Sequence, residues 1–266
     1  MAILSFGHSD LVMFSLREFQ SSLKSRYAGR PTYVFAAVDS TNSYLRSLAL
    51  AGASEGTCVL AEFQFAGRGR FDRPWYSSPD LNLTFSILLH SPGTLAHPGT
   101  LSLIISDAVA RSVEETTGRQ VETRWPNDVY LNGRKLAGIL LERVPAGDEL
   151  TVAGIGLNVN QTLFPAEIAD RATSLKSETG KEIGREGLLA RLLLSIERTL
   201  ADEPAAVLRS WRSRFRFIGH EVTLVVGDRS VTGFVEGIGA EGELLFHDQT
   251  GATRRYYAGE IQRVLQ

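Results

Sequence analysis

Arginine and glycine alternate in one short segment, residues 67–75, which reads Gly-Arg-Gly-Arg-Phe-Asp-Arg-Pro-Trp. Glycine lets the backbone approach a ligand closely and exposes amide donors. Arginine offers a planar fork of donors that fits phosphate or carboxylate. The segment therefore predicts an anion-binding loop, mobile until an anionic ligand orders it, with Trp75 able to stack on a flat ring. A solvated surface loop and an Arg-Gly RNA-binding tail are the alternatives.

A second segment places a lysine close to an aspartate. Residues 124–128 read Arg-Trp-Pro-Asn-Asp, and residues 135–142 read Lys-Leu-Ala-Gly-Ile-Leu-Leu-Glu after a short turn. A lysine that opens an apolar strand has its ammonium at the rim, where it suits a phosphate or carboxylate. Asp128 could orient that lysine or take a proton. A plain turn and an edge lysine that reaches solvent are the alternatives.

Two further polar segments give weaker signals. Residues 39–42, Asp-Ser-Thr-Asn, suit the cap of a helix or the polar head of a small ligand. Residues 154–160, Gly-Ile-Gly-Leu-Asn-Val-Asn, place small residues at a strand end, where a ligand could approach the backbone. Asn158 could donate to and accept from a base or amide. A strand that simply ends in a turn is the alternative.

The elements that must position these residues alternate between strands and helices. Period-two and β-branched patterns predict strands at residues 33–38, 57–63, 83–89, 121–124, 129–131, 135–144 and 150–156. Helical spacing predicts helices at residues 11–24, 42–50, 99–117 and 186–200. Asn132-Gly133 is a hairpin signal. These elements indicate an α+β domain over residues 1–218.

The character of the chain changes near Ile218. Short strands are expected at residues 222–226, 230–236, 244–247 and 253–257, with glycine-rich turns between them. They predict a small barrel-like β domain over residues 219–266.

Composition excludes several classes of protein. Lys plus Arg total 28 and Asp plus Glu total 30, and this balance disfavours nucleic acid as the main partner. A single cysteine, Cys58, rules out an intrachain disulfide framework and a cysteine-rich zinc site, and its apolar surroundings predict a core residue. The start shows no secretory pattern, and the longest uncharged run, residues 81–106, is broken by proline and glycine. A cytoplasmic protein without a membrane span is expected.

In this order and spacing, the segments resemble the catalytic domain of biotin–protein ligases. The matching stretches are residues 39–42, 62–77, 82–83 with Ser86, 124–128, 135–142 and 154–158. The resemblance covers roughly residues 34–160, and residues 219–222 and 259–261 are similar to the family's C-terminal domain. It implies a class II synthetase-like mixed sheet followed by a small SH3-like β-barrel.

The resemblance also implies an activity. Such an enzyme joins biotin to ATP as biotinyl-5′-AMP and passes the biotin to a lysine of a biotin carboxyl carrier protein of a carboxylase. Mg²⁺ would ride on the ATP phosphates, with no metal site on the protein and no tightly bound prosthetic group. Family members are often dimers through the sheet edge, so a homodimer is expected.

Roles for individual residues follow from the resemblance. Biotin would be held by Ser40, Thr41, Asn42, Gln64, Gly67, Arg68, Arg70, Lys135, Gly138 and Gly156. ATP and the adenylate would be held by Arg68, Arg70, Arg73, Trp75, Asn127, Lys135 and Asn158. Catalysis would fall to Arg68, Lys135 and Asp128. The chemistry agrees, because a carboxylate that attacks a phosphate needs positive charge placed beforehand.

The chain also departs from the family's pattern. Asp72 and Asp80 stand where the family often has glycine, which would affect the loop and not the cations. About 32 residues precede the first expected strand, too few for the winged helix-turn-helix of repressor members. A monofunctional ligase without operator binding is therefore expected.

Three other functions stay open at this point. A lipoate–protein ligase shares the fold and the adenylate chemistry, but it is not usually marked by Gly-Arg-Gly-Arg with a following tryptophan. A nucleic-acid binding module would use the arginine loop and the small barrel. A non-catalytic biotin sensor would bind biotin without activating it.

Overall fold

The computed structural model describes residues 13–145, 149–248 and 250–262. Its larger part is a seven-stranded sheet in the order β1-β2-β3-β7-β6-β5-β4, in which only β1 and β2 run parallel. The strands are β1 (Thr32–Val38), β2 (Cys58–Gln64), β3 (Leu83–His90), β4 (Glu122–Arg124), β5 (Asp128–Leu131), β6 (Arg134–Arg143) and β7 (Leu150–Leu157). The predicted α+β class with a mixed sheet is confirmed.

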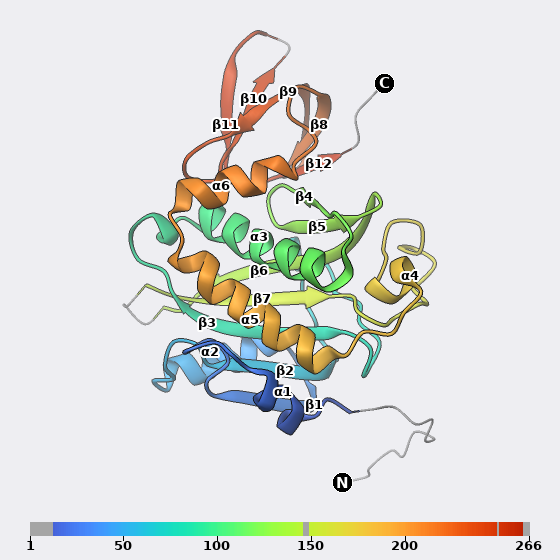
Figure 1. The fold of residues 1–266 in the computed structure, drawn as a ribbon. Coiled ribbons are helices and arrows are strands. Elements are labelled where there is room, and N and C mark those ends of the chain that lie inside the picture. The colour runs from blue at the N-terminus through green and yellow to red at the C-terminus, as the bar shows by residue number, and fades with distance from the viewer. Residues whose placement is uncertain (1–12, 146–148, 249, 263–266) are drawn as a thin grey trace.

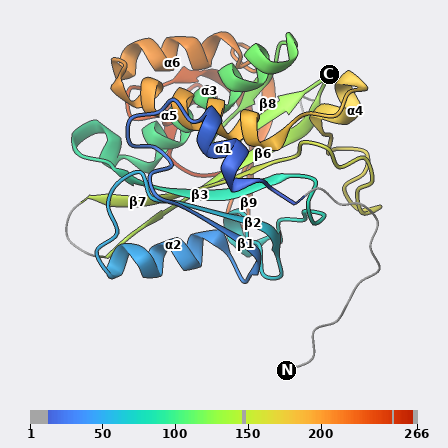
Figure 2. The same ribbon diagram turned by 60° about the horizontal axis from the view of Figure 1, so that its bottom comes forward.

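Helices cover the two faces of this sheet unequally. The helices are α1 (Leu16–Ser22), α2 (Thr41–Leu50), α3 (Pro98–Thr117), α4 (Leu175–Thr179), α5 (Arg185–Ala201) and α6 (Pro204–Ser213). Figure 2 shows α1, α3 and α5 on one face and α2 alone on the other. The first face buries the main core, and α2 closes a smaller cluster with β2, β3 and β7. The α2 face is therefore only partly covered by helices.

Period-two alternation decides which side chains reach that second face. Register pairs Ser86 with Gly154 and Gly138 with Gly156, so these positions lie on one face of the sheet. The same alternation puts Glu142 beside Val152, which belongs to the α2 cluster. A band of small and polar residues thus runs across β3, β7 and β6 beyond the end of α2.

A buried ion pair fixes the end of β2 that leads to this band. Glu62 Oε2 lies 2.5 Å from an Arg185 guanidinium nitrogen, and Glu62 Oε1 accepts from the other guanidinium nitrogen at 3.1 Å. Both side chains are almost fully buried. Because a buried charge without its partner is costly, the pair ties β2 firmly to the start of α5.

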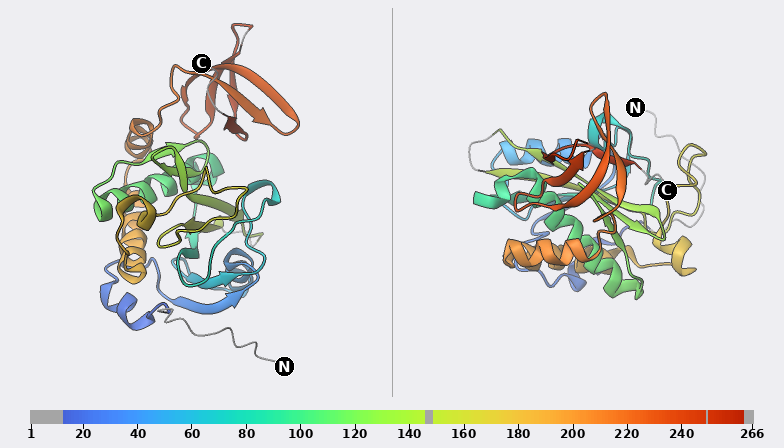
Figure 3. Two further views of the ribbon diagram at one scale, coloured as in Figure 1. Left: turned by 90° about the vertical axis from the view of Figure 1, so that its right-hand side faces the viewer. Right: turned by 90° about the horizontal axis from the view of Figure 1, so that it is seen from above.

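A second, antiparallel sheet of five strands has the order β11-β10-β9-β8-β12. Its strands are β8 (Glu221–Val226), β9 (Arg229–Ile238), β10 (Leu244–Asp248), β11 (Thr253–Tyr256) and β12 (Glu260–Gln262). Figures 1 and 3 show it at one end of the molecule, beyond α6. It agrees with the SH3-like domain that was expected. The boundary expected between residues 218 and 219 lies in the connection from α6 to β8 and stays a prediction.

The small sheet packs tightly on the larger part. Trp211 of α6 and Leu103 of α3 share one buried cluster with Val222 and Phe246 of the small sheet. The indole N–H of Trp125 donates to the carbonyl oxygen of Gly242 at 2.9 Å. Apolar contact of this kind restricts the motion of the two units relative to each other.

Several local predictions can be compared with the structure. The hairpin is confirmed, since Asn132 and Gly133 both have the positive φ that a type I′ turn needs. The predicted helix over residues 11–24 begins outside the described residues and is shorter where described. Helices α4 and α6 and strand β12 were not predicted.

Cys58 is a core residue as expected, and burial raises the pKa of its thiol to about 12. No helix among the described residues combines the length and apolarity that crossing a membrane requires.

Candidate active site

A pair of facing glycines forms a flat platform on the open face of the sheet. Gly138 of β6 and Gly156 of β7 are cross-strand partners. The indole of Trp75 lies on them, and a Cβ added at Gly156 would sit 2.3 Å from the ring. A Cβ at Gly138 would meet the same ring at 3.2 Å. Glycine is required here because the aromatic ring packs directly on backbone.

The arginine loop, residues 67–75, is closed on itself by backbone hydrogen bonds. Gly69 N–H donates to Arg73 O at 2.7 Å, and Trp75 N–H donates to Gly67 O at 2.9 Å. A short 3₁₀ helix, η1 (Arg70–Asp72), forms its tip. Phe71 and Asp72 both have positive φ, and so does Asp80 farther along. Left-handed backbone at both aspartates is the conformation that glycine adopts most readily.

A polar network lies between α2 and the sheet. Gln64 Oε1 accepts from the backbone N–H of Thr41 at 2.8 Å and from its hydroxyl at 3.1 Å. Ser86 Oγ lies 2.7 Å from Thr41 Oγ1 and 2.6 Å from Asn42 Oδ1. The Asn42 side chain packs on Gly154, where an added Cβ would come within 2.1 Å of it. The structure therefore brings the predicted biotin-head residues together and adds Ser86 to them.

Ser40 begins α2 in a different way from a capping serine. Its side chain makes no capping hydrogen bond, and its backbone N–H binds Asp39 Oδ1 at 2.6 Å instead. Ser40 thus occupies the predicted N-cap position of α2, but its hydroxyl does not cap the helix. Ser40 is buried and directly precedes Thr41 of the polar network.

Two of the predicted cations are paired with carboxylates on the sheet. Lys135 Nζ lies 2.7 Å from Asp128 Oδ1, and an Arg68 guanidinium nitrogen lies 3.3 Å from Glu142 Oε1. Lys135 is also 5.8 Å from the centre of the Trp75 ring. Both pairs are partly exposed, so each contributes little to stability and can exchange partners. Of the predicted catalytic residues, Lys135 and Asp128 therefore lie beside Gly138, while Arg68 lies farther along β6, at Glu142.

The other two arginines reach the C-terminal domain. Arg70 donates to Asn127 Oδ1 at 3.3 Å and to Gly259 O at 3.1 Å. Arg73 pairs with Glu260 Oε2 at 2.7 Å. Burial lowers the pKa of Arg70, although nearby Asp128 and Glu260 oppose that effect. A guanidinium stays charged under these conditions, so Arg70 is a desolvated cation beside the platform.

Asn158 has an unused acceptor. Its side-chain nitrogen donates to Thr173 O at 3.0 Å, while its buried Oδ1 makes no hydrogen bond. A buried acceptor without a partner costs about 1–3 kcal/mol. An N–H donor of a bound ligand would satisfy it.

Sequence reasoning gave no role to Glu142 and Glu260, which pair with two of the site's arginines. Glu142 has the same parity along β6 as Gly138, so period-two alternation could have placed its carboxylate on the same face of the sheet. Glu260 offered no such signal, because it follows Arg73 by 187 residues.

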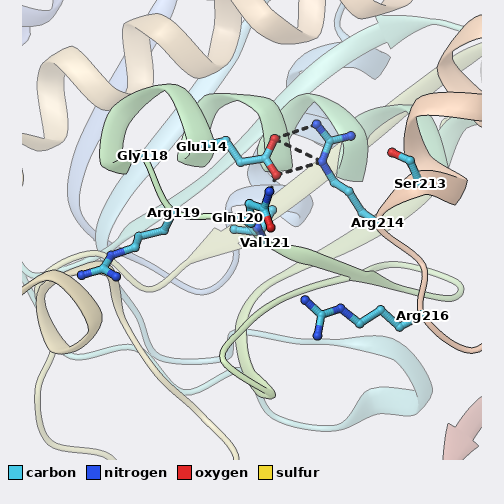
Figure 4. A pocket seen from close by; sticks show the side chains of 8 residues that line it. All are labelled: Glu114, Gly118, Arg119, Gln120, Val121, Ser213, Arg214 and Arg216. Carbon is cyan, nitrogen blue, oxygen red and sulfur yellow. Dashed lines mark hydrogen bonds and ion pairs between the residues drawn. The ribbon is translucent and has the colours of Figure 1, made fainter.

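A cavity of about 450 Å³ lies away from this site. It sits beside the end of α3 and is lined by Glu114, Arg119, Arg214 and Arg216 among others. Figure 4 shows Glu114 already paired with Arg214. None of the predicted site residues lines it.

Residues 34–160 match the Biotin/lipoate A/B protein ligase family, and residues 217–264 match the Biotin protein ligase C terminal domain. The chain is 34% identical over 255 residues to the bifunctional ligase/repressor BirA of Bacillus subtilis, covering 92% of this chain and 78% of that protein. The chain belongs to the biotin protein ligase family.

Other family members support the same assignment. The biotin–[acetyl-CoA-carboxylase] ligase of Paracoccus denitrificans is 31% identical over 229 residues, which is 82% of this chain and 95% of that protein. Among solved structures, the biotin protein ligase from Aquifex aeolicus in complex with biotin and ATP has a TM-score of 0.78 at 32% identity. That match covers 89% of this chain and 100% of the other. Both domains of the family are therefore present.

Proposed function

We propose that this chain activates biotin with ATP to form biotinyl-5′-AMP and then transfers the biotinyl group to a lysine of a biotin carboxyl carrier protein. The observation that carries the proposal is the cluster of Arg68, Arg70 and Lys135 around the Gly138–Gly156 platform, in a chain of this family. Such a cluster provides preplaced positive charge where two anions must meet.

In the first step, a carboxylate oxygen of biotin attacks the α-phosphorus of ATP, and the bond to pyrophosphate breaks. Lys135 would leave Asp128, and Arg68 would leave Glu142, to bind the oxygens of the biotin carboxylate and the α-phosphate. Arg70 would face the phosphates. No group of three His, Cys, Asp or Glu side chains suited to a metal occurs among the described residues. Mg²⁺ would enter bound to ATP, where it neutralises phosphate charge.

In the second step, the neutral amine of the acceptor lysine attacks the carbonyl carbon of the mixed anhydride, and AMP leaves. The amine loses a proton as the amide forms. Asp128 is the carboxylate next to Lys135 and would take that proton or orient Lys135. The arginine loop would keep water from the labile anhydride.

The roles of the remaining residues are part of the same proposal. Thr41, Asn42, Gln64 and Ser40 would surround the ureido head, and Gly67 would give the loop close backbone approach. Trp75 and Asn158 would flank the adenine, and Arg73 and Asn127 would hold the loop and Arg70 in place. Trp75 now lies on Gly138 and Gly156, so a ring bound there would pack against the indole or displace it.

The chain would also have an acceptor protein as its partner and would form a homodimer. The Paracoccus denitrificans relative is named for acetyl-CoA carboxylase, so the acceptor here would be the carrier protein of such an enzyme. A homodimer would form along the open edge of β1, which pairs only with β2 in the described sheet. A cytoplasmic location stays a prediction.

A test must separate this activity from that of a lipoate ligase. Incubation with biotin, MgATP and a carrier domain should add one biotinyl group to the carrier, measured by mass spectrometry. ATP–pyrophosphate exchange should require biotin. Exchange with lipoate and none with biotin would refute the proposal. Biotin binding without exchange would indicate a sensor, and strongly salt-dependent binding of nucleic acid would indicate a different function.

A further inference from the structure

Glu142 lies between the polar network beside α2 and Arg68 of the arginine loop. Its side chain is 23% exposed and lies on the platform face of β6. One carboxylate oxygen, Oε2, accepts from Asn42 Nδ2 at 2.7 Å. The other, Oε1, accepts from Arg68 at 3.3 Å. Glu142 thus connects Asn42 of the polar network to Arg68 of the arginine loop.

Asn42 anchors this carboxylate. The Asn42 side chain is buried, and its nitrogen also lies 3.3 Å from Leu140 O. Its Oδ1 accepts from Ser86 at 2.6 Å. Because both ends of the amide are used and the side chain is pressed on Gly154, Asn42 cannot turn without losing buried hydrogen bonds. One oxygen of Glu142 is therefore fixed, and the other faces Arg68.

Arg68 is held much less firmly. Its side chain is 42% exposed, and its bonds to Glu142 and to Ser43 Oγ measure 3.3 and 3.4 Å. These distances are at the long end of the hydrogen-bond range. A substrate carboxylate that forms a shorter, charge-assisted pair would displace Glu142 easily.

We infer that Glu142 is a positioning residue whose carboxylate holds Arg68 beside the place of the biotin carboxylate and releases it when that carboxylate binds. The inference rests on the proposed function. The inference predicts the direction in which biotin affinity changes, because Glu142 competes with the biotin carboxylate for Arg68. Removing the charge of Glu142 tightens biotin binding, whereas loss of a merely structural residue weakens it.

The test is calorimetric titration of biotin into the full chain and its variants. Glu142→Gln keeps an oxygen for Asn42 and removes the charge, so the Kd for biotin should fall about two- to fivefold. In an Arg68→Ala background the same change should have no effect, because the competition needs Arg68. Glu182→Gln, at an exposed ion pair with Lys176, is the matched control and should leave the Kd unchanged.

Thermal unfolding of each variant verifies that it is folded. If Glu142→Gln fails to fold, Glu142→Asp replaces it, since a shorter carboxylate cannot reach both Asn42 and Arg68 and should also tighten binding. An unchanged or higher Kd in a folded variant overturns the inference while the proposed function stands. Tightening that persists without Arg68 also overturns it. Failure of the parent chain to bind biotin overturns both.

Discussion

The ammonium of Lys135 lies 2.7 Å from a carboxylate oxygen of Asp128, so the cation nearest the platform already has a partner on the neighbouring strand. This pair spans the β5–β6 hairpin, whose turn is fixed by Asn132 and Gly133. The lysine is therefore held in place by a short, well-defined local structure, although its site also needs residues from distant parts of the chain.

Lys135→Ala should slow adenylate formation while leaving the fold intact. Removing one preplaced charge at a developing anion typically costs on the order of 10²–10³ in rate. Biotin-dependent ATP–pyrophosphate exchange measures this step. Lys176→Ala, at the exposed pair with Glu182, is the control and should keep the parent rate. An unchanged rate in Lys135→Ala would remove Lys135 from the proposed mechanism.

Arg68→Ala should let the adenylate escape. A charged hydrogen bond contributes roughly 1.5–3 kcal/mol, so release of biotinyl-AMP should accelerate about tenfold or more. A chase experiment with labelled adenylate measures the release. Arg46→Ala, an exposed arginine on α2, serves as the comparison. Equal release from both variants would mean that the loop does not retain the intermediate through Arg68.

Gly156→Ala should push Trp75 off the platform. The added Cβ would lie 2.3 Å from the indole, which no real contact permits. We expect a red-shifted tryptophan emission and a loss of stability of about 1–3 kcal/mol, as for other overpacked sites. Gly187→Ala is the control, because a Cβ there has open space around it. Emission identical to the parent would show that Trp75 packs elsewhere in solution.

Glu178 should make the fold sensitive to acid. Burial alone would raise the pKa of this carboxyl, but hydrogen bonds from Thr173 and Asn132 and the charge of Arg134 outweigh burial and lower it. A lowered pKa in the folded state adds stability above the ordinary glutamate pKa of about 4.3, and this stability is lost as the pH falls below that value.

Glu178→Gln should therefore lower the Tm at pH 7 and reduce the further fall in Tm between pH 5 and pH 3, relative to the parent. Differential scanning calorimetry across this range makes the comparison. Glu182→Gln removes an exposed carboxylate from the same region and should follow the parent curve. Parallel curves for the parent and Glu178→Gln would contradict the assignment.

Much of the larger domain could be predicted because its signals are local. The strand at residues 83–89 is an apolar run, and the helix at residues 99–117 ends at Gly118, which is left-handed as a C-cap glycine should be. The hairpin between β5 and β6 follows from two residues. Each of these depends on neighbours in sequence.

What could not be predicted depends on distant partners. Helix α6 is short, and its apolar residues Val207, Leu208 and Trp211 are buried, with Leu208 and Trp211 in the cluster that includes the small sheet. Arg68 finds its carboxylate 74 residues away in Glu142. No pattern in the sequence specifies such a pairing, because side chains meet only after the strands have taken their register.

The contacts of Arg70 with Gly259 and of Arg73 with Glu260 have a consequence for engineering. The C-terminal domain supplies hydrogen-bond acceptors to the arginine loop, so it cannot be exchanged freely for the same domain of another protein. A chimera that carries the corresponding domain of a distant relative should be active only if that domain places a carbonyl oxygen beside Arg70 and a carboxylate beside Arg73.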